Sequence, residues 1–268
     1  MNFSTFIKEI IFYNKYMLKK IFISDIMILS KERKQTMITN EQFLEKIKGG
    51  LIVSCQALSN EPLYNANVMG DMANAAQMGG AVGIRANTVK DICEIKAKVD
   101  LPIIGIIKEE YDDSEVFITP TMLEVDQLVE CGCEVIALDA TNRKRPQGIE
   151  LEDFFKEVKR KYPNQLFMAD CSTFSEGIKA AELGFDLIGT TLCGYTKYTK
   201  GISLPNYDLI KKLSISINSP IVAEGGIWQP EQLVKAYQSG AYTAIVGTAI
   251  TRPMNITQKF VDAIASIK

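Results

Sequence analysis

Histidine is absent from all 268 residues of the chain, which removes the commonest general base and the commonest metal ligand of proteins. No Ser-His or Cys-His pair can form, so proton chemistry falls to lysine, glutamate, aspartate, tyrosine or cysteine. A zinc site would have to use cysteine alone, and Cys131 and Cys133 stand too close together and lack partners nearby in the sequence. We therefore expect no metal site.

A dominant charge sign, paired cysteines and long apolar runs are also missing. The formal net charge is −2, which gives no electrostatic reason to expect nucleic acid or an anionic membrane as a partner. The six cysteines form no CxxC pair and follow no clear secretion signal, so they are typical of reduced thiols in a cytoplasmic protein. Hydrophobic residues make up 47% of the chain, enough for one large core or two small ones.

Residues 1–40 differ in composition from the rest and are interpreted as an N-terminal extension of unknown role. Charged residues interrupt their apolar stretches, which stay far short of the roughly 20 residues of a membrane-spanning helix. Three interpretations are open: an appended helix, a weak membrane-surface helix, or a leader upstream of a start at Met37. We favour the leader, because MITNEQFLEKIKGG reads as a clean beginning in which Asn40 caps a helix that ends at Gly49 and Gly50.

Residues 41–268 alternate short apolar runs with amphipathic segments that end at glycine, where a left-handed helix cap belongs. The runs are apolar on both faces, as buried parallel strands are. They are LIVSCQ (51–56), AVGIRA (81–86), PIIGIIK (102–108), EVIALDA (134–140), LFMADC (166–171), LIGTTLC (187–193), PIVAEGG (220–226) and TAIVGTAI (243–250). Eight such units in about 220 residues predict a single-domain (β/α)8 barrel, the TIM-barrel architecture. An open doubly wound sheet needs a glycine-rich phosphate turn after the first strand, and VSCQALSNEP has none.

Polar residues follow nearly every expected strand, at the end where such barrels place their chemistry. Any one of them is equally well explained as a solvated loop residue, but the opposite strand ends begin with Leu, Ala, Pro and Ile. Arginine suits a planar amide or carboxylate, glutamine suits sugar hydroxyls, and the aspartates either bind hydroxyls or hold loops together. The candidate substrate-binding residues are Gln56, Arg85, Asp139, Asp170 and Arg252.

Lys108 ends a strand that is otherwise apolar. At the mouth of a barrel its ammonium group faces a partly dry cavity, which should lower its pKa toward a useful range. Without histidine, Lys108 is the best candidate to take a proton from carbon. Glu224 lies across the barrel and is the candidate second acid–base, although a structural Lys108–Glu224 ion pair is the alternative interpretation.

Two glycine-containing stretches, AEGGI (223–227) and VGTAITRP (246–253), follow the last two expected strands. Backbone N–H groups and a short helix N-terminus at these places can hold a phosphate. Glycine is favoured there because the chain approaches the anion closely, and Arg252 can add a charge-assisted contact. The predicted phosphate-binding residues are Gly225, Gly226, Gly247 and Thr248, although ordinary turns would also explain the glycines.

These stretches together resemble the N-acetylmannosamine-6-phosphate 2-epimerases of bacterial sialic acid catabolism. The likeness runs from about residue 46 to the end of the chain and leaves the first forty residues outside. It rests on GLIVSCQAL (50–58), GIRAN (83–87), PIIGIIK (102–108), ITPTMLEVDQL (118–128), IALDATNRKRP (136–146), MADCST (168–173), GTTLCGYT (189–196), AEGGI (223–227) and GTAITRP (247–253).

The resemblance implies interconversion of N-acetylmannosamine 6-phosphate and N-acetylglucosamine 6-phosphate without a cofactor. It implies a catalytic Lys108 supported by Glu224, with Gln56, Arg85, Asp170 and Arg252 in the binding site. Another phosphosugar isomerase, a Schiff-base aldolase on the same barrel, and a non-catalytic amino-sugar-phosphate sensor are the alternatives. A homodimer is consistent with the architecture, because exposed helix faces of barrels often pair.

Overall fold

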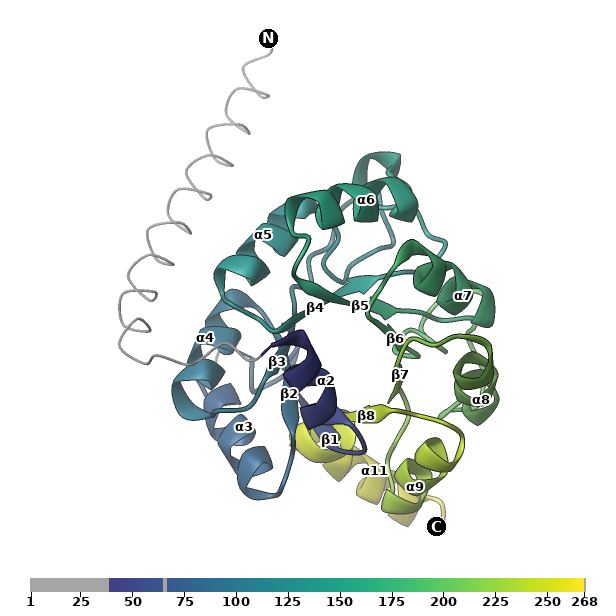
Figure 1. Ribbon diagram of the computed structural model, residues 1–268. Coiled ribbons are helices and arrows are strands. Elements are labelled where there is room, and N and C mark those ends of the chain that lie inside the picture. The colour runs from purple at the N-terminus through teal and green to yellow at the C-terminus, as the bar shows by residue number, and fades with distance from the viewer. Residues whose placement is uncertain (1–38, 65–66, 268) are drawn as a thin grey trace, which may run out of the picture. The chain divides into compact units, whose positions relative to one another are not determined.

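The computed structural model describes residues 39–64 and 67–267. The expected extension and the start at Met37 lie outside these ranges. Eight parallel strands close into a barrel in chain order, as the sequence predicts (Figure 1). They are β1 (Leu51–Cys55), β2 (Gly83–Asn87), β3 (Ile103–Ile106), β4 (Val135–Asp139), β5 (Leu166–Asp170), β6 (Leu187–Gly189), β7 (Ile221–Glu224) and β8 (Thr243–Val246).

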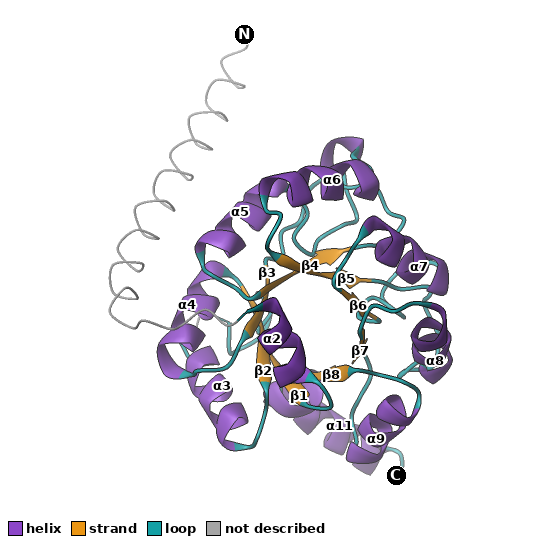
Figure 2. Ribbon diagram, viewed as in Figure 1, coloured by secondary structure: helices purple, strands orange, loops and turns teal. Residues whose placement is uncertain are grey.

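Helices surround the strands, except that α2 lies across one end of the barrel (Figure 2). They are α2 (Asn40–Ile47), α3 (Met69–Met78), α4 (Val89–Lys98), α5 (Met122–Glu130), α6 (Leu151–Lys161), α7 (Phe174–Leu183), α8 (Tyr207–Ser216), α9 (Pro230–Gln238), α10 (Thr248–Thr251) and α11 (Pro253–Ala265). A 3-10 turn, η1 (Pro146–Gly148), precedes α6. Pairing of β1 with β8 closes the ring. The glycine caps behave as expected: Gly184, at the end of α7, has φ +90° in the left-handed region.

The short helix α2 covers the amino-terminal end of the barrel. Its Phe43 and Ile47 are buried against the apolar side chains that fill the barrel interior, such as Ile52 and Ile245. The hydroxyl of Tyr242 donates to the Leu44 carbonyl oxygen over 2.9 Å and fixes the helix in place. Because this end is closed, the carboxyl ends of the strands form the only open mouth of the described barrel.

Some local expectations are wrong, among them the end of the sixth strand, which stops at Gly189 and does not extend to the end of LIGTTLC. The cap of α2 is Thr39 rather than Asn40, because Thr39 and Gln42 form a reciprocal capping box that needs a hydroxyl three residues before Gln. The last strand ends at Val246, and residues 248–251 form α10 instead of continuing it. An unbroken apolar run such as TAIVGTAI cannot distinguish a strand from a short helix by periodicity alone.

No helix within residues 39–64 and 67–267 is both long enough and apolar enough to cross a membrane.

Candidate active site

Three charged side chains from different strands meet inside the mouth. Arg85, on β2, makes a two-pronged ion pair with Asp170 at the end of β5, with Nη2–Oδ2 at 2.6 Å and Nη1–Oδ1 at 3.0 Å. The same Nη1 lies 2.8 Å from Oε2 of Glu224 at the end of β7. The side chains of Arg85 and Asp170 are 1% and 0% exposed, whereas that of Glu224 is 14% exposed. Of the two carboxylates, Glu224 is therefore the one that faces the open end.

Two threonines after β6 fix the positions of the two carboxylates in this cluster. The Thr191 hydroxyl lies 2.6 Å from Asp170 Oδ1 and 2.9 Å from Glu224 Oε2, so it bridges the two carboxylates. The Thr190 hydroxyl accepts from the Glu224 N–H and donates to the Glu224 carbonyl oxygen. Glu224 is thereby fixed at both its backbone and its side chain, which leaves the carboxylate little freedom to leave Arg85.

Burial and pairing act on the charges of this cluster in opposite directions. Burial raises the pKa of Glu224, and the Arg85 guanidinium offsets part of that rise. Burial lowers the pKa of Arg85, but the carboxylates of Asp170 and Glu224 more than reverse this and hold it above its usual range. Arg85 is therefore charged at every pH at which the fold is stable. No group of three Cys, Asp or Glu side chains in the described part of the chain is arranged to hold a metal ion.

Lys108 lies just beyond the end of β3 and is half-buried. Its backbone N–H donates to the side-chain oxygen of Asn87 over 2.9 Å, which ties its position to the end of β2. Burial lowers the pKa of Lys108 to about 8, helped by the nearby positive charges of Arg85 and Arg252 and opposed by Glu224 and Asp170. This is the direction that the sequence predicts.

The alternative Lys108–Glu224 ion pair is not formed, because Glu224 pairs with Arg85 instead. Among the described residues, the Lys108 ammonium makes neither an ion pair nor a side-chain hydrogen bond. A half-buried amine without a fixed partner, whose pKa is close to neutral, is suited to accept a proton from a bound molecule.

Two buried polar atoms at the mouth have no partner within the described residues. Gln56 donates its Nε2 to the Ser54 hydroxyl over 2.8 Å, but its Oε1 is unsatisfied. The Nε of Arg85 is also unsatisfied, because its carboxylate contacts use only the two terminal nitrogens. One acceptor and one donor at the mouth are thus left unmet, although buried polar groups normally have partners.

The predicted phosphate residues lie in two adjacent loops, after β7 and after β8. Gly225 and Gly226 have φ values of +111° and +71°, and a Cβ on Gly226 would come within 2.3 Å of the Leu204 Cβ, so glycine is required there. Gly247 precedes α10 and Thr248 begins it. No acceptor in the described part of the chain takes the N–H of Gly225 or Gly226.

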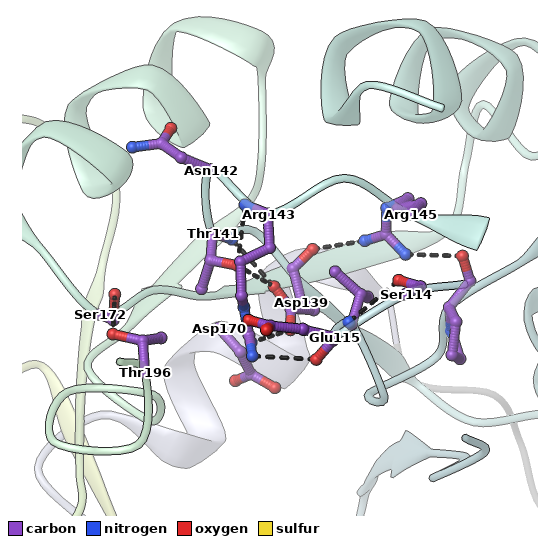
Figure 3. Close-up of polar contacts among 12 residues, drawn as sticks. Ser114, Glu115, Asp139, Thr141, Asn142, Arg143, Arg145, Asp170, Ser172 and Thr196 are labelled. Atoms are coloured by element: carbon purple, nitrogen blue, oxygen red, sulfur yellow. Dashed lines mark hydrogen bonds and ion pairs between the residues drawn. The ribbon is translucent and has the colours of Figure 1, made fainter. Parts of the chain in front are cut away.

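Asp139 is occupied by a loop network above β4 (Figure 3). Its Oδ1 accepts from both the N–H and the hydroxyl of Thr141, and its Oδ2 lies 2.6 Å from Nη2 of Arg143. Arg143 also donates to the Glu115 carbonyl oxygen over 2.9 Å, which joins the loop after β4 to the loop that follows Lys108. These contacts favour the interpretation that Asp139 holds loops together.

Comparisons with known proteins identify the family of this chain. The model of a family described as "Putative N-acetylmannosamine-6-phosphate epimerase" matches residues 69–266. The chain belongs to this family.

Named relatives extend the match over most of the chain. A "Putative N-acetylmannosamine-6-phosphate 2-epimerase" of Caldanaerobacter subterraneus is 52% identical over 82% of this chain and 93% of its own length. A Borreliella afzelii protein of the same description is 54% identical over 84% of this chain and 98% of its own length. The solved structure of the N-acetylmannosamine-6-phosphate 2-epimerase from Clostridium perfringens superposes with a TM-score of 0.80. It is 51% identical and covers 85% of this chain and 99% of its own.

For this family member, the structure adds residues that sequence reasoning missed. Thr190 and Thr191 lie within the run LIGTTLC and Asn87 within GIRAN, and the sequence alone assigns none of them a role. Their signal in the sequence is weak, because a threonine or an asparagine at a strand end is equally typical of an ordinary turn. Their roles follow from contacts with Glu224, Asp170 and Lys108.

Proposed function

We propose that this chain interconverts N-acetylmannosamine 6-phosphate and N-acetylglucosamine 6-phosphate by moving the proton on C2, in the breakdown of amino sugars such as sialic acid. The observation that carries the proposal is the unpaired, half-buried amine of Lys108, with its pKa lowered to about 8, beside the Arg85–Asp170–Glu224 cluster. Membership in a family of N-acetylmannosamine-6-phosphate epimerases supports the choice of substrate.

The chemistry needs a base of this kind. In the open-chain sugar the C2 hydrogen lies next to the aldehyde, so its removal gives a carbanion that is stabilised as the enolate of that aldehyde. Lys108, as the neutral amine, takes this proton onto Nζ, and a proton returned to the opposite face of C2 completes the inversion. Glu224 either orients Lys108 or relays the proton. The carboxylate can do this because it is the more exposed of the two acids held by Arg85.

The remaining polar groups hold the substrate at both ends. The unsatisfied Oε1 of Gln56 and Nε of Arg85 are the groups assigned to the N-acetyl group and hydroxyls. Asp170 holds Arg85 in place on that side, and Asp139 fixes the neighbouring loop. The loops of Gly225, Gly226, Gly247 and Thr248, together with Arg252, hold the 6-phosphate. Binding energy from this distant phosphate positions C2 against Lys108.

Proton exchange in D2O tests the proposal directly. The purified full-length protein is incubated with N-acetylmannosamine 6-phosphate, and the products are followed by NMR. We expect N-acetylglucosamine 6-phosphate to form, with deuterium at C2 of both epimers. Saturable binding without exchange would identify a sensor. Borohydride trapping of the sugar on Lys108, detected by mass spectrometry, would identify a Schiff-base aldolase.

The activity should also rise with pH. Lys108 accepts a proton only as the neutral amine, and its pKa is about 8, so kcat/KM should increase about tenfold per pH unit below that value and level off above it. The measurement is kcat/KM between about pH 6.5 and pH 9.5, with urea denaturation over the same range as the control for folding. A flat profile, or one that falls with pH, would assign proton removal to another group.

A further inference from the structure

Arg252, the proposed phosphate ligand, is held by a carboxylate from another loop. Its Nε lies 3.4 Å from Oε1 of Glu61, and the two side chains are 22% and 9% exposed. Glu61 belongs to the loop after β1, whereas Arg252 follows β8 and α10. These loops are neighbours because β1 and β8 pair directly at the closure of the barrel.

The Glu61 carboxylate is itself fixed. Its Oε2 accepts the N–H of Leu58 over 2.7 Å, and the Glu61 N–H donates back to the Leu58 carbonyl oxygen over 2.9 Å. The N–H of Tyr64 donates to the Glu61 carbonyl oxygen in the next turn. Glu61 is therefore a largely buried acid in a hydrogen-bonded turn, and its position does not depend on Arg252.

Nε is the Arg252 atom closest to the Glu61 carboxylate. Within the described residues, the two terminal nitrogens of Arg252 make no hydrogen bond. A guanidinium held by one edge presents a pair of donors in a fixed plane, the geometry that matches two oxygens of a phosphate. The positive charge of Arg252 acts on Lys108, which places it toward the same mouth.

We propose that Glu61 is a positioning residue for phosphate recognition: it orients Arg252 so that the terminal nitrogens of the guanidinium meet the 6-phosphate of the sugar. This rests on the proposed function in that the substrate is a phosphosugar. A free carboxylate near a phosphate would repel it. The charge of Glu61 is instead balanced by Arg252, and its carboxylate also accepts the Leu58 N–H. The pair therefore favours phosphate binding by ordering the Arg252 side chain before the ligand arrives.

The test compares E61Q with E110Q in the full-length protein. Glutamine at position 61 can still accept the Leu58 N–H but loses the charge that holds Arg252. Glu110 is an exposed acid in the loop after β3, so E110Q removes the same charge without touching Arg252. Inorganic phosphate binding is measured by calorimetry, and KM and kcat are measured with the phosphosugar.

For E61Q we expect the Kd for inorganic phosphate and the KM to rise about tenfold with kcat unchanged, which is the size expected for loss of one charge-assisted contact. E110Q should match the wild type. In an R252Q background, adding E61Q should change neither constant further, because Glu61 acts through Arg252.

Unchanged or tighter phosphate binding by E61Q would overturn the proposal. So would equal losses in both backgrounds, or a fall in kcat with unchanged KM. The calorimetric experiment does not depend on turnover, so a wild type that binds phosphate but leaves the sugar unchanged would refute the epimerase function alone. A wild type that binds no phosphate would refute the role of Glu61.

Discussion

Replacing Lys108 by methionine should lower kcat by about a thousandfold and abolish deuterium exchange at C2, since general base catalysis typically contributes 10²–10⁴ in rate. Methionine keeps an unbranched side chain of similar length in the half-buried site and removes only the amine. Inorganic phosphate should still bind, because the proposed phosphate ligands follow β7 and β8, whereas Lys108 follows β3. The measurements are turnover, NMR-detected exchange and phosphate titration on the same preparation.

The same substitution should stabilise the fold. Burial lowers the pKa of Lys108 from 10.5 to about 8, so below pH 8 the folded protein holds a charged amine in a site that disfavours it. Removing the amine relieves this penalty fully below pH 8, and the gain vanishes above the unfolded value of 10.5. K200M, which alters an exposed lysine in the loop after β6, is the matched control. Exchange at the wild-type rate in K108M would remove Lys108 from the mechanism.

The barrel itself was predictable from the sequence because a parallel strand buried on both faces requires an unbroken run of apolar residues. Runs such as PIIGIIK and LFMADC are apolar throughout, and helical segments that stop at glycine separate them. The direction of the pKa shift of Lys108 was predictable for the same reason, since a lysine that ends such a run must face the barrel mouth. Both inferences use only the hydrophobic pattern of the nearby sequence and the rule that the chemistry of such barrels lies at the carboxyl ends of the strands.

The pairing inside the mouth was not predictable, because it joins side chains that are far apart in the chain. Arg85 is 85 residues from Asp170 and 139 residues from Glu224, and nothing local to any of them specifies the partner. Charge alone suggested a Lys108–Glu224 pair equally well. The choice depends on the shape and reach of the side chains: the planar fork of arginine can contact both carboxylates at once, whereas an ammonium is a single point charge.

Removing Arg85 should therefore destabilise the protein severely. In R85M two largely buried carboxylates lose their common counter-ion, and loss of one partner from a buried ion pair typically costs 3–5 kcal/mol in the free energy of unfolding. Urea denaturation of R85M and the wild type measures the difference. R145M is the matched control, because Arg145 is also 1% exposed but donates to the carbonyl oxygens of Thr119, Pro120 and Asp139.

The pH dependence separates the two buried arginines. Without Arg85 the pKa of Glu224, already raised by burial, loses the opposing effect of the guanidinium and rises further. A raised folded-state pKa of an acid gives stability that is present below the unfolded value and is lost as the pH rises through the folded value. The difference in free energy of unfolding between the wild type and R85M should therefore grow between about pH 5 and pH 8. The loss of stability in R145M should grow less over this range, since Asp139 loses the effect of Arg145 but keeps its ion pair with Arg143. If R85M lost the same free energy of unfolding at about pH 5 and about pH 8, the Arg85 cluster would not be what holds Glu224 ionised.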